Sequence, residues 1–431
     1  MFRIDTHEKI TGMELERMLL DVATAPIAAL DAADPIAGLR AAFRLPKSKI
    51  YLDGNSLGAL PASAPTRINR VVEQEWGEDL IDSWNKNGWI GMPQRVGDRI
   101  AQLIGAGPGE VVAADSTSVN LLKLLSCALS LRPERRVILS DSGNFPNDLY
   151  IAQGLAALLE RDHELRVVAP EEVADAIDEE LAVLLLTDVD YRTGRRHNMT
   201  KLTARAHAAG ALTIWDLCHS AGAIDVDLNS ANADLAVGCG YKYLNGGPGA
   251  PGFMFVAARH QSSIRPAVSG WMGHERPFEF DLEYRPAEGI ARNLAGTPAI
   301  IGLTVLESSL DIFERTDMHA LRGKSIALGN LFIELFDEKL ASLGLELVTP
   351  RLANERGSQI SLRHPQGYAI MQALIARGVI GDFRAPDILR FGLTPLYTRF
   401  ADVEQAVLLL EEIIVSGAWR APAYSLRKLV T

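Results

Sequence analysis

The sequence lacks several features that would place it in a specialised class of protein. Only 3 of its 431 residues are cysteines. Cys127, Cys218 and Cys239 lie in apolar stretches and form no C-x-x-C pair, so neither a disulfide framework nor a metal site is expected. No uncharged apolar run approaches the roughly 18 residues that a membrane helix needs. These absences favour a globular enzyme away from membranes, with the cysteines as small core residues.

Basic residues are also in the minority. The chain carries 43 Lys and Arg against 54 Asp and Glu, for a formal net charge of -11. Polyanion binding needs clustered basic side chains, so no nucleic acid partner is expected. The N-terminus, "MFRIDTHEKITGMELERMLL", alternates charged and apolar residues and lacks the apolar core of a signal peptide. This pattern favours a cytoplasmic location.

The chain does contain a regular alternation of short aliphatic runs and helical patterns. Strands are predicted at 135–141, 165–170, 182–190, 211–216 and 233–240. Helical stretches such as 149–162 and 199–210 separate several of them. Buried strands that alternate with helices form a mainly parallel sheet covered on both faces. The sequence therefore predicts an α/β fold.

The pattern changes at about Gly289. Beyond it, helical stretches dominate, and the strand-like pieces 358–364 and 388–393 follow them. We therefore predict a large α/β sheet domain over 53–287. A smaller α+β domain would be built from both chain ends, 1–52 and 288–431.

Polar side chains follow the predicted strands, and ligands of open parallel sheets bind beyond the carboxyl ends of the strands. Ser116 and Thr117 stand between a strand and a helix. Free amides at such a helix start, together with two hydroxyls, can hold a phosphate group. Taken alone, the pair is more often an ordinary helix cap.

Three further residues suggest what the phosphate belongs to. Asp216 ends a strand, where a carboxylate can pair with a protonated ring nitrogen, and His219 follows it. Lys242 stands in "GCGYKYLNGGPGAPGFMFV", where partial burial would lower its pKa and favour Schiff-base chemistry. Singly, each has an ordinary structural interpretation. Together with the phosphate cradle, they indicate pyridoxal 5'-phosphate.

Several stretches also carry a family resemblance. In chain order these are "YLDGNSLGALP", "GNFPNDLYIAQGL", "WDLCHSAGA", "YKYLNGGPGAPGF", "SGWMGH" and "LRFGLTPLYT". Over nearly the whole chain they resemble bacterial kynureninases, pyridoxal-phosphate-dependent enzymes of fold type I. The resemblance implies hydrolysis of L-kynurenine to anthranilate and L-alanine by Cβ–Cγ cleavage, in tryptophan degradation by the kynurenine pathway. It also implies a homodimer whose active sites are shared across subunits.

The resemblance gives each matching residue a role. Lys242 would bond to the cofactor and transfer protons, Asp216 would bind the pyridine nitrogen, and Tyr241 would contact the phosphate and shuttle a proton. The remaining cofactor contacts would be Ser116 and Thr117 at the phosphate, Phe145 on the ring, Asp148, Thr187 and His219 as polar neighbours, and Trp271 and Thr297 from the other subunit.

Two residues would contact the substrate. Arg390 would grip the α-carboxylate with a bidentate fork. Trp84 would lie beside the aromatic ring and favour L-kynurenine over its 3-hydroxy form. Asp188, at a position that varies in the family, adds a charge near the site. The sequence does not reveal which group activates water, or whether the pathway is catabolic or biosynthetic.

Two other functions fit the sequence less well. A cysteine desulfurase of the same fold needs a nucleophilic cysteine in the second half of the chain, and none follows Cys239. A non-catalytic nucleotide-binding module would use "GAGPGE" (105–110), but that run follows a helical pattern and precedes a strand. A dinucleotide loop has the opposite order.

Overall fold

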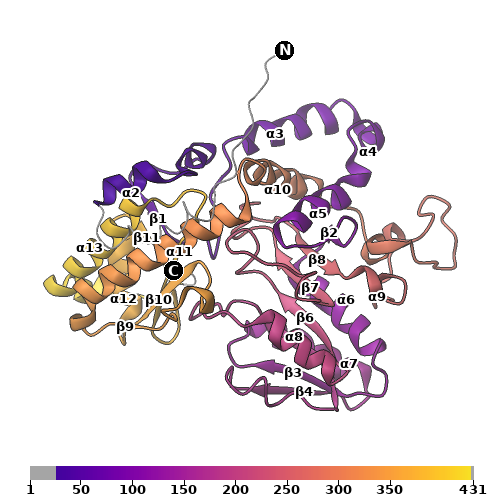
Figure 1. Cartoon of the computed structure of the whole chain (residues 1–431). Helices are drawn as coiled ribbons and strands as arrows, with labels where there is room; N and C mark the ends of the chain where they lie inside the picture. The colour runs from indigo at the N-terminus through magenta and orange to yellow at the C-terminus, as the bar shows by residue number, and fades with distance from the viewer. Residues whose placement is uncertain (1–25, 429–431) are drawn as a thin grey trace.

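The computed structural model describes residues 26–428 and shows a large and a small sheet side by side, each with its own helices (Figure 1). The prediction that the N-terminus lacks a signal peptide concerns residues 1–20, which lie outside the described residues. The predicted small domain includes residues 1–25, so it lies partly outside them. Within the described part, no helix has both the length and the apolar character needed to cross a membrane.

The large sheet has the strand order β2-β8-β7-β6-β5-β3-β4. Its strands are β2 (Val111–Ala113), β3 (Val137–Asp141), β4 (Glu164–Val168), β5 (Leu181–Thr187), β6 (Leu212–Asp216), β7 (Leu235–Cys239) and β8 (Gly252–Val256). All five predicted strands are confirmed. Every residue of β5, β6 and β7 is buried, which explains their continuous apolar sequences.

One strand departs from the parallel arrangement. Strand β8 runs antiparallel to both β7 and β2, whereas β7, β6, β5, β3 and β4 pair in parallel. A parallel return needs a crossover, usually through a helix. The connection 240–251 contains no helix, so the chain turns back on itself. This turn carries Lys242.

Helices cover both faces of the large sheet. On one face α6 (Thr117–Ser130) and α7 (Pro146–Leu159) share a hydrophobic cluster with the strands. On the other face the cluster includes α5 (Met92–Leu103), α8 (Met199–Ala208) and α10 (Ile300–Phe313). Shorter helices near this body are α3 (Ala64–Arg70), α4 (Ser83–Lys86) and α9 (Ala258–Gln261).

The small sheet is antiparallel, with the order β12-β13-β10-β9. Its strands are β9 (Glu346–Leu347), β10 (Gln359–Arg363), β12 (Asp382–Arg384) and β13 (Ile388–Gly392). A separate hydrophobic cluster joins it to α2 (Ile27–Ala33), α11 (Met318–Leu335), α12 (Gly367–Ala376) and α13 (Phe400–Ser416).

The N-terminal segment joins the small sheet's part of the molecule. Strand β1 (Ile50–Tyr51) pairs in parallel with β11 (Val379–Ile380), and Asp53 bridges to Gly392 at the end of β13. This pairing places residues 53–58 between the two sheets. The exact division into domains at 53–287 stays a prediction.

Candidate active site

Lys242 and His219 are in direct contact beyond the ends of β7 and β6. Lys242 Nζ lies 3.0 Å from His219 Nε2. His219 is buried, and its Nδ1 atom has no hydrogen-bond partner among the described residues. Burial and the charge of Lys242 hold the pKa of His219 well below its usual value. The imidazole is therefore neutral at pH 7 and accepts the hydrogen bond from the lysine.

The pKa of Lys242 differs from the sequence-based expectation. Burial alone lowers it, as expected, but Cys239, Cys218 and other acidic groups nearby outweigh burial and raise the pKa above its usual value. The predicted lowering of this pKa is therefore wrong. The amine is therefore a cation in a half-buried site. In the same site, burial raises the pKa of Tyr241 to about 12, so its hydroxyl keeps its proton.

Two carboxyl groups face each other near this lysine. Asp216 ends β6, and its Oδ1 accepts a hydrogen bond from the amide of Cys218 at 2.7 Å. Asp148 lies in the first turn of α7 and is buried. Burial and the charge of Asp216 raise the pKa of Asp148 well above its usual value. Asp148 Oδ2 has no partner among the described residues, which fits a ligand that brings a buried N–H group.

Ser116 and Thr117 lie at the start of α6, as the sequence predicts. Ser116 caps α6, and its Oγ accepts a hydrogen bond from the amide of Val119 at 3.4 Å. Thr117 begins the helix, and its hydroxyl donates to the carbonyl of Gly238 at 3.2 Å. The first amides of α6 therefore point beyond the sheet edge, where an anion is favoured.

A buried lysine that the sequence did not single out supports this cradle. Lys123 is fully buried on α6. Its Nζ donates to Asp115 Oδ2 at 2.6 Å and to the carbonyl of Asn293 at 2.7 Å. Asp115 adopts a φ of +49° just before the cradle, so Lys123 fixes this strained residue. The sequence could have revealed this residue, because Lys123 stands in an otherwise apolar helical stretch.

Phe145 and Tyr191 connect the lysine to the small sheet. Lys242 Nζ lies 5.8 Å from the centre of the Phe145 ring. That ring packs edge-on against Tyr191, with 5.1 Å between ring centroids. The carbonyl of Tyr191 accepts a hydrogen bond from Arg390 Nη1. Contacts through Tyr191 and Phe145 therefore connect Arg390 to Lys242, and its role at the site stays a prediction.

The guanidinium of Arg390 is already engaged. Its side chain is 1% exposed and forms a two-point ion pair with Asp382, with Nε 2.7 Å from Oδ1. Ser56 Oγ joins the pair, 2.7 Å from Asp382 Oδ2 and 3.1 Å from Arg390 Nη2. Arg384 adds an ion pair to Asp382 Oδ2 at 2.9 Å. We call Ser56, Asp382, Arg384 and Arg390 the arginine–aspartate cluster.

Thr187 is the last residue of β5, and Asp188 follows it with different contacts. The hydroxyl of buried Thr187 donates to the carbonyl of Val189 at 3.1 Å. Asp188 is fully buried, accepts a hydrogen bond from Ser220 Oγ at 2.6 Å and pairs with Arg196 at 3.4 Å. The charge that Asp188 adds is therefore balanced locally.

Three predicted site residues have their described contacts elsewhere in the chain. Trp84 lies on α4 and packs edge-on against Trp89. Helix α4 lies at the end of the molecule away from the small sheet (Figure 1). Trp271 is 41% exposed and packs against Phe278, and Thr297 is also exposed. Among the described residues of one chain, no hydrogen bond or ring contact joins any of these three residues to Lys242.

The glycines around Lys242 serve the backbone. A Cβ on Gly58 would lie 2.3 Å from the carbonyl oxygen of Lys242, so only glycine allows this close approach. Gly247 and Gly249 adopt φ values of +75° and +80°, which favour glycine. These residues shape the turn that presents the lysine.

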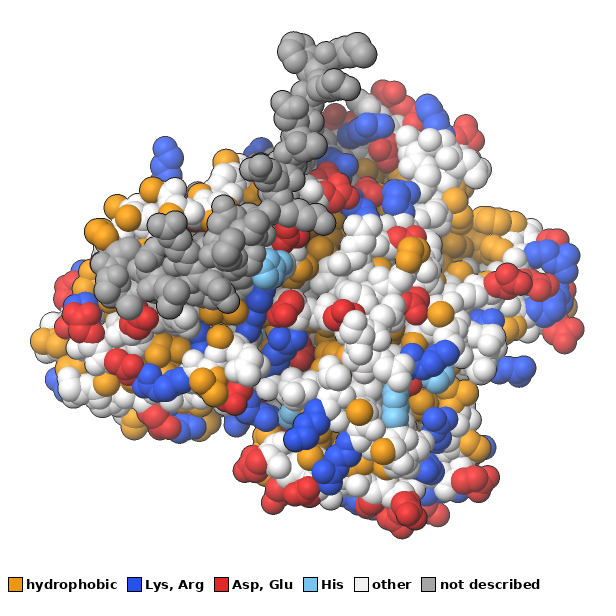
Figure 2. All heavy atoms as spheres, viewed as in Figure 1, with side chains coloured by type: hydrophobic (Ala, Val, Ile, Leu, Met, Phe, Trp, Pro, Cys, Tyr) orange, Lys and Arg blue, Asp and Glu red, His pale blue; other side chains and the backbone are white. Residues whose placement is uncertain are grey.

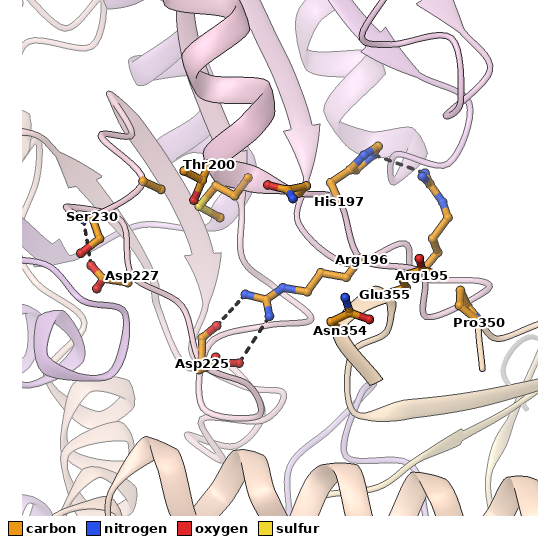
Figure 3. A pocket seen from close by; sticks show the side chains of 13 residues that line it. Arg195, Arg196, His197, Thr200, Asp225, Asp227, Ser230, Pro350, Asn354 and Glu355 are labelled. Carbon is orange, nitrogen blue, oxygen red and sulfur yellow. Dashed lines mark hydrogen bonds and ion pairs between the residues drawn. The ribbon is translucent and has the colours of Figure 1, made fainter. Parts of the chain in front are cut away.

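A separate pocket is lined by residues around 195–200, 225–231 and 350–355 (Figure 3). Arg196 on its wall pairs with Asp225 at 3.3 Å and with Asp188. Near it, His197 Nε2 lies 2.6 Å from Asp141 Oδ2. Since these charged groups are already paired, we assign no ligand to this pocket.

Solved structures share the fold at low sequence identity. A cysteine desulfurase from Thermococcus onnurineus matches with a TM-score of 0.73 and 19% identity, over 88% of this chain and 98% of that chain. A cysteine desulfurase from Escherichia coli gives 0.72 and 18%, over the same shares. A C-DES mutant with glycine covalently linked to its PLP cofactor gives 0.73 and 16%, over 85% and 97%. The fold is that of pyridoxal-phosphate-dependent enzymes of fold type I.

Curated relatives narrow this class. A kynureninase of Burkholderia pseudomallei is 55% identical over 408 residues, 94% of this chain and 98% of the relative. A kynureninase of Pseudomonas fluorescens is 52% identical over the same shares. The family model "Kynureninase C-terminal domain" matches residues 321–410. The chain belongs to the kynureninase family, whose cofactor is pyridoxal 5'-phosphate.

Proposed function

We propose that this enzyme hydrolyses L-kynurenine to anthranilate and L-alanine. The observation that carries the proposal is the contact of Lys242 with His219 beside the Asp148–Asp216 pair, in a chain that belongs to the kynureninase family. A cysteine desulfurase function is not supported, because no cysteine follows Cys239. The likeness to desulfurases concerns the fold alone.

The described residues fit pyridoxal phosphate. The unpartnered Asp148 oxygen and the adjacent Asp216 carboxyl suit a protonated pyridine nitrogen. The start of α6, with Ser116 and Thr117, suits the phosphate. When bound, the cofactor supplies an aldehyde that condenses with amines and a ring that accepts electrons from the bond being broken.

The residues of the chain would then divide the proton transfers. Lys242 Nζ would remove the α-proton of the substrate. Asp216 would accept a hydrogen bond from the protonated pyridine nitrogen. Tyr241 holds its proton at neutral pH because its pKa is raised to about 12, so it acts as a donor. Phe145 would exclude water from the cofactor.

The substrate carboxylate would bind at the arginine–aspartate cluster. Arg390 is linked to the lysine site through Tyr191 and Phe145, which supports its predicted role. Hydration of the side-chain ketone would precede Cβ–Cγ cleavage, because the hydrated carbon leaves as the carboxylate of anthranilate. The pathway that this reaction serves would be tryptophan degradation.

The enzyme would act as a homodimer with shared sites. The exposed positions of Trp271 and Thr297 suit contacts to a partner's phosphate. The segment after Trp271 protrudes in Figure 1 and carries Phe278, Phe280 and Leu282, which are 59%, 74% and 103% exposed. Figure 2 shows exposed hydrophobic side chains gathered on this side of the molecule. A second copy would cover such a surface.

The deciding experiment incubates the purified, cofactor-loaded protein with L-kynurenine. Fluorescence would report anthranilate, and an amino-acid assay would report alanine. We expect the two products in a 1:1 ratio. A cofactor-loaded protein that releases neither product, or that releases sulfur from cysteine instead, would contradict the proposal.

A further inference from the structure

Lys123 joins two segments that lie far apart in the sequence. Its side chain is fully buried on α6, and Nζ donates to Asp115 Oδ2 at 2.6 Å and to the carbonyl of Asn293 at 2.7 Å. Asn293 lies 170 positions further along the chain. A buried ammonium is costly unless its charge and its hydrogen bonds are satisfied, so these two contacts hold both segments in place.

The first segment is the turn from β2 into α6. Asp115 directly precedes Ser116 and adopts a φ of +49°. Its carbonyl accepts a hydrogen bond from the amide of Gly252 at 2.8 Å. The ion pair with Lys123 fixes the side chain of Asp115 where the backbone turns into the helix. It therefore helps to position the two hydroxyl residues that follow.

The second segment begins where a short 3-10 helix, Gly289–Asn293, ends. Residues 294–297 follow this helix, and the carbonyl of Ala295 accepts a hydrogen bond from the amide of Met272 at 3.2 Å. A Cβ on Gly270 would lie 2.3 Å from the same carbonyl oxygen, so the two backbones pack directly against each other. The contact that holds Asn293 therefore also supports the loop at 270–273.

These two segments carry the predicted phosphate contacts. Ser116 and Thr117 belong to the first segment, whereas Trp271 and Thr297 belong to the second. In the proposed dimer, the first pair would serve the cofactor of its own subunit and the second pair that of the partner subunit. One ammonium, that of Lys123, therefore connects what a single chain contributes to two cofactor sites.

The charge of Lys123 also suits an anion site. Asp115 is 29% exposed and stands one residue before the cradle. A carboxylate at this place repels a phosphate unless a cation balances it. Lys123 supplies the cation from the buried side, so the start of α6 keeps its preference for an anion.

We propose that Lys123 is a positioning residue for both cofactor phosphates of the dimer. Through Asp115 it sets the cradle of its own subunit, and through Asn293 it sets the segment that the chain offers to the partner subunit. The inference rests on the proposed function, because it needs both the cofactor and the shared site. Lys123 acts through these two contacts, so its loss should weaken binding of the phosphate group in particular.

The first experiment compares two ligands on Lys123→Met, which keeps most of the side-chain length and removes the charge. Pyridoxal 5'-phosphate carries the phosphate, and pyridoxal is the same aldehyde without it. Borohydride reduction and mass spectrometry count the adduct at Lys242 as the ligand is titrated. We expect the affinity for pyridoxal phosphate to fall roughly 10-fold or more. The affinity for pyridoxal should stay within about twofold of wild type.

Lys324→Met is the matched control. Lys324 is also buried and pairs with a carboxylate, with Nζ 2.7 Å from Asp34 Oδ2, but it lies on α11 beside the small sheet. This variant should lose stability in urea unfolding, as Lys123→Met does, and still bind both ligands as wild type does. Lys123→Met/Asp115→Asn removes both charges of the pair. It replaces Lys123→Met if that variant does not fold, with the same ligand pattern expected.

Mixed dimers of differently tagged chains separate the two contacts. In a dimer of Lys123→Met with Lys242→Ala, the one reactive lysine lies beside the altered cradle. In a dimer of wild type with Lys123→Met/Lys242→Ala, it lies beside an intact cradle and an altered segment from the other chain. The reference is a dimer of wild type with Lys242→Ala. We expect both altered dimers to bind pyridoxal phosphate more weakly than the reference, by roughly threefold or more.

Two results would overturn the inference. In one, Lys123→Met loses affinity for pyridoxal as strongly as for pyridoxal phosphate, or loses neither. In the other, either altered dimer binds the cofactor as tightly as the reference. Cofactor binding is measured without substrate, so a protein that binds the cofactor but does not hydrolyse L-kynurenine contradicts the proposed function separately.

Discussion

At the scale of single residues, Lys242 is held by contacts that the reaction has to replace. Its amine is a cation bonded to neutral His219 at 3.0 Å. A nucleophilic amine must first lose a proton. The raised pKa of Lys242 therefore opposes cofactor capture at low pH, and the capture rate should increase as the pH rises toward the pKa of the amine.

Replacing Lys242 tests the covalent bond to the cofactor. In Lys242→Ala we expect no covalent cofactor adduct after borohydride reduction, and a loss of activity of about 1,000-fold or more. Mass spectrometry and the anthranilate assay provide the two measurements. Lys201→Ala, at an exposed position on α8, is the control and should retain both. An adduct that persists in Lys242→Ala would assign the bond to another lysine.

Trp84 tests substrate choice. The wild-type enzyme should have a higher kcat/KM for L-kynurenine than for 3-hydroxy-L-kynurenine, because an indole offers a ring hydroxyl no acceptor. Trp84→His should shift the ratio toward the hydroxylated substrate by about tenfold or more. Trp76→His, at a tryptophan that is 59% exposed nearby, should leave the ratio unchanged. An equal shift in both variants would remove Trp84 from the site.

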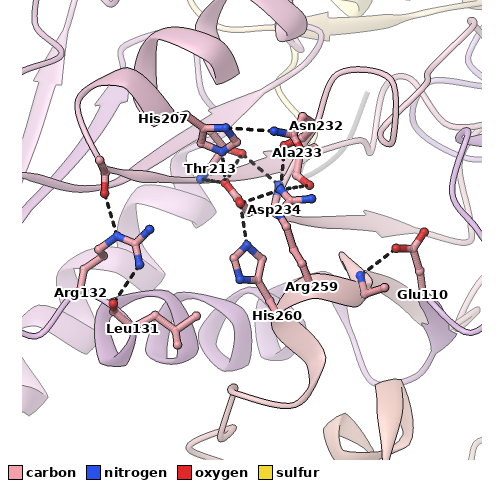
Figure 4. Close-up of polar contacts among 12 residues, drawn as sticks. Glu110, Leu131, Arg132, His207, Thr213, Asn232, Ala233, Asp234, Arg259 and His260 are labelled. Carbon is pink, nitrogen blue, oxygen red and sulfur yellow. Dashed lines mark hydrogen bonds and ion pairs between the residues drawn. The ribbon is translucent and has the colours of Figure 1, made fainter.

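At the scale of elements, a buried aspartate joins the strands and helices at the edge of the sheet away from Lys242. Asp234 precedes β7 and accepts hydrogen bonds from the amide of Thr213 on β6, His207 on α8, and Arg259 and His260 on α9, at 2.7 to 2.9 Å (Figure 4). Burial alone raises its pKa, but the bonds to His260 and His207 outweigh burial and hold it far below its usual value.

The depressed pKa of Asp234 determines how its contribution to the free energy of unfolding depends on pH. A group with a lower pKa in the folded state stabilises the fold above its unfolded pKa, which is about 4 for Asp. Asp234→Asn should therefore lower the free energy of unfolding by about 3 kcal/mol at pH 7. The difference should persist to about pH 5 and shrink progressively below about pH 4, because the unfolded wild-type chain then binds a proton that the folded chain still excludes.

Urea unfolding at several pH values measures this difference. Asp175→Asn is the control, because Asp175 is 88% exposed in its pair with Arg205, and such pairs contribute 1 kcal/mol or less, roughly. A deficit of Asp234→Asn that is absent at pH 7, or that grows below pH 4, would contradict the assignment.

The elements were largely predictable, but several contacts of the site were not. The hydrophobic pattern and the composition of short segments predicted the strands, because both are local properties of the sequence. The same patterns placed Asp216 and Lys242 at strand ends, since the sheet dictates where such ends meet. The pairing of Asp382 with Arg390 and Ser56 joins segments far apart in sequence. No local pattern marks Asp382, and the antiparallel direction of β8 depends on a connection without a helix.

At the scale of the whole molecule, the shared active site can be tested with mixed dimers. Lys242→Ala should be inactive, and Thr297→Glu should be inactive because its charge repels the partner's phosphate. A mixed dimer then has both defects in one site and an intact second site. Random pairing makes about half of the dimers mixed, so refolding the two variants together should restore roughly a quarter of wild-type activity.

Each variant refolded alone is the control and should stay inactive. Size-exclusion chromatography confirms that the refolded chains are dimeric. Folded mixed dimers without activity would mean that Thr297 serves its own subunit, and the shared-site proposal would then fail.

The bond between Ser56 and Asp382 also has a consequence for the order in which the protein becomes active during synthesis. The two residues are separated by 326 positions. When Lys242 and the last strand of the large sheet leave the ribosome, Asp382 and both arginines of the cluster have not been translated. On the proposal that this cluster binds the substrate carboxylate, a nascent chain that has folded its large sheet would still lack the anion-binding residues. Under that proposal, catalysis would begin only when the polypeptide is nearly complete, so unfinished chains would not act on the substrate.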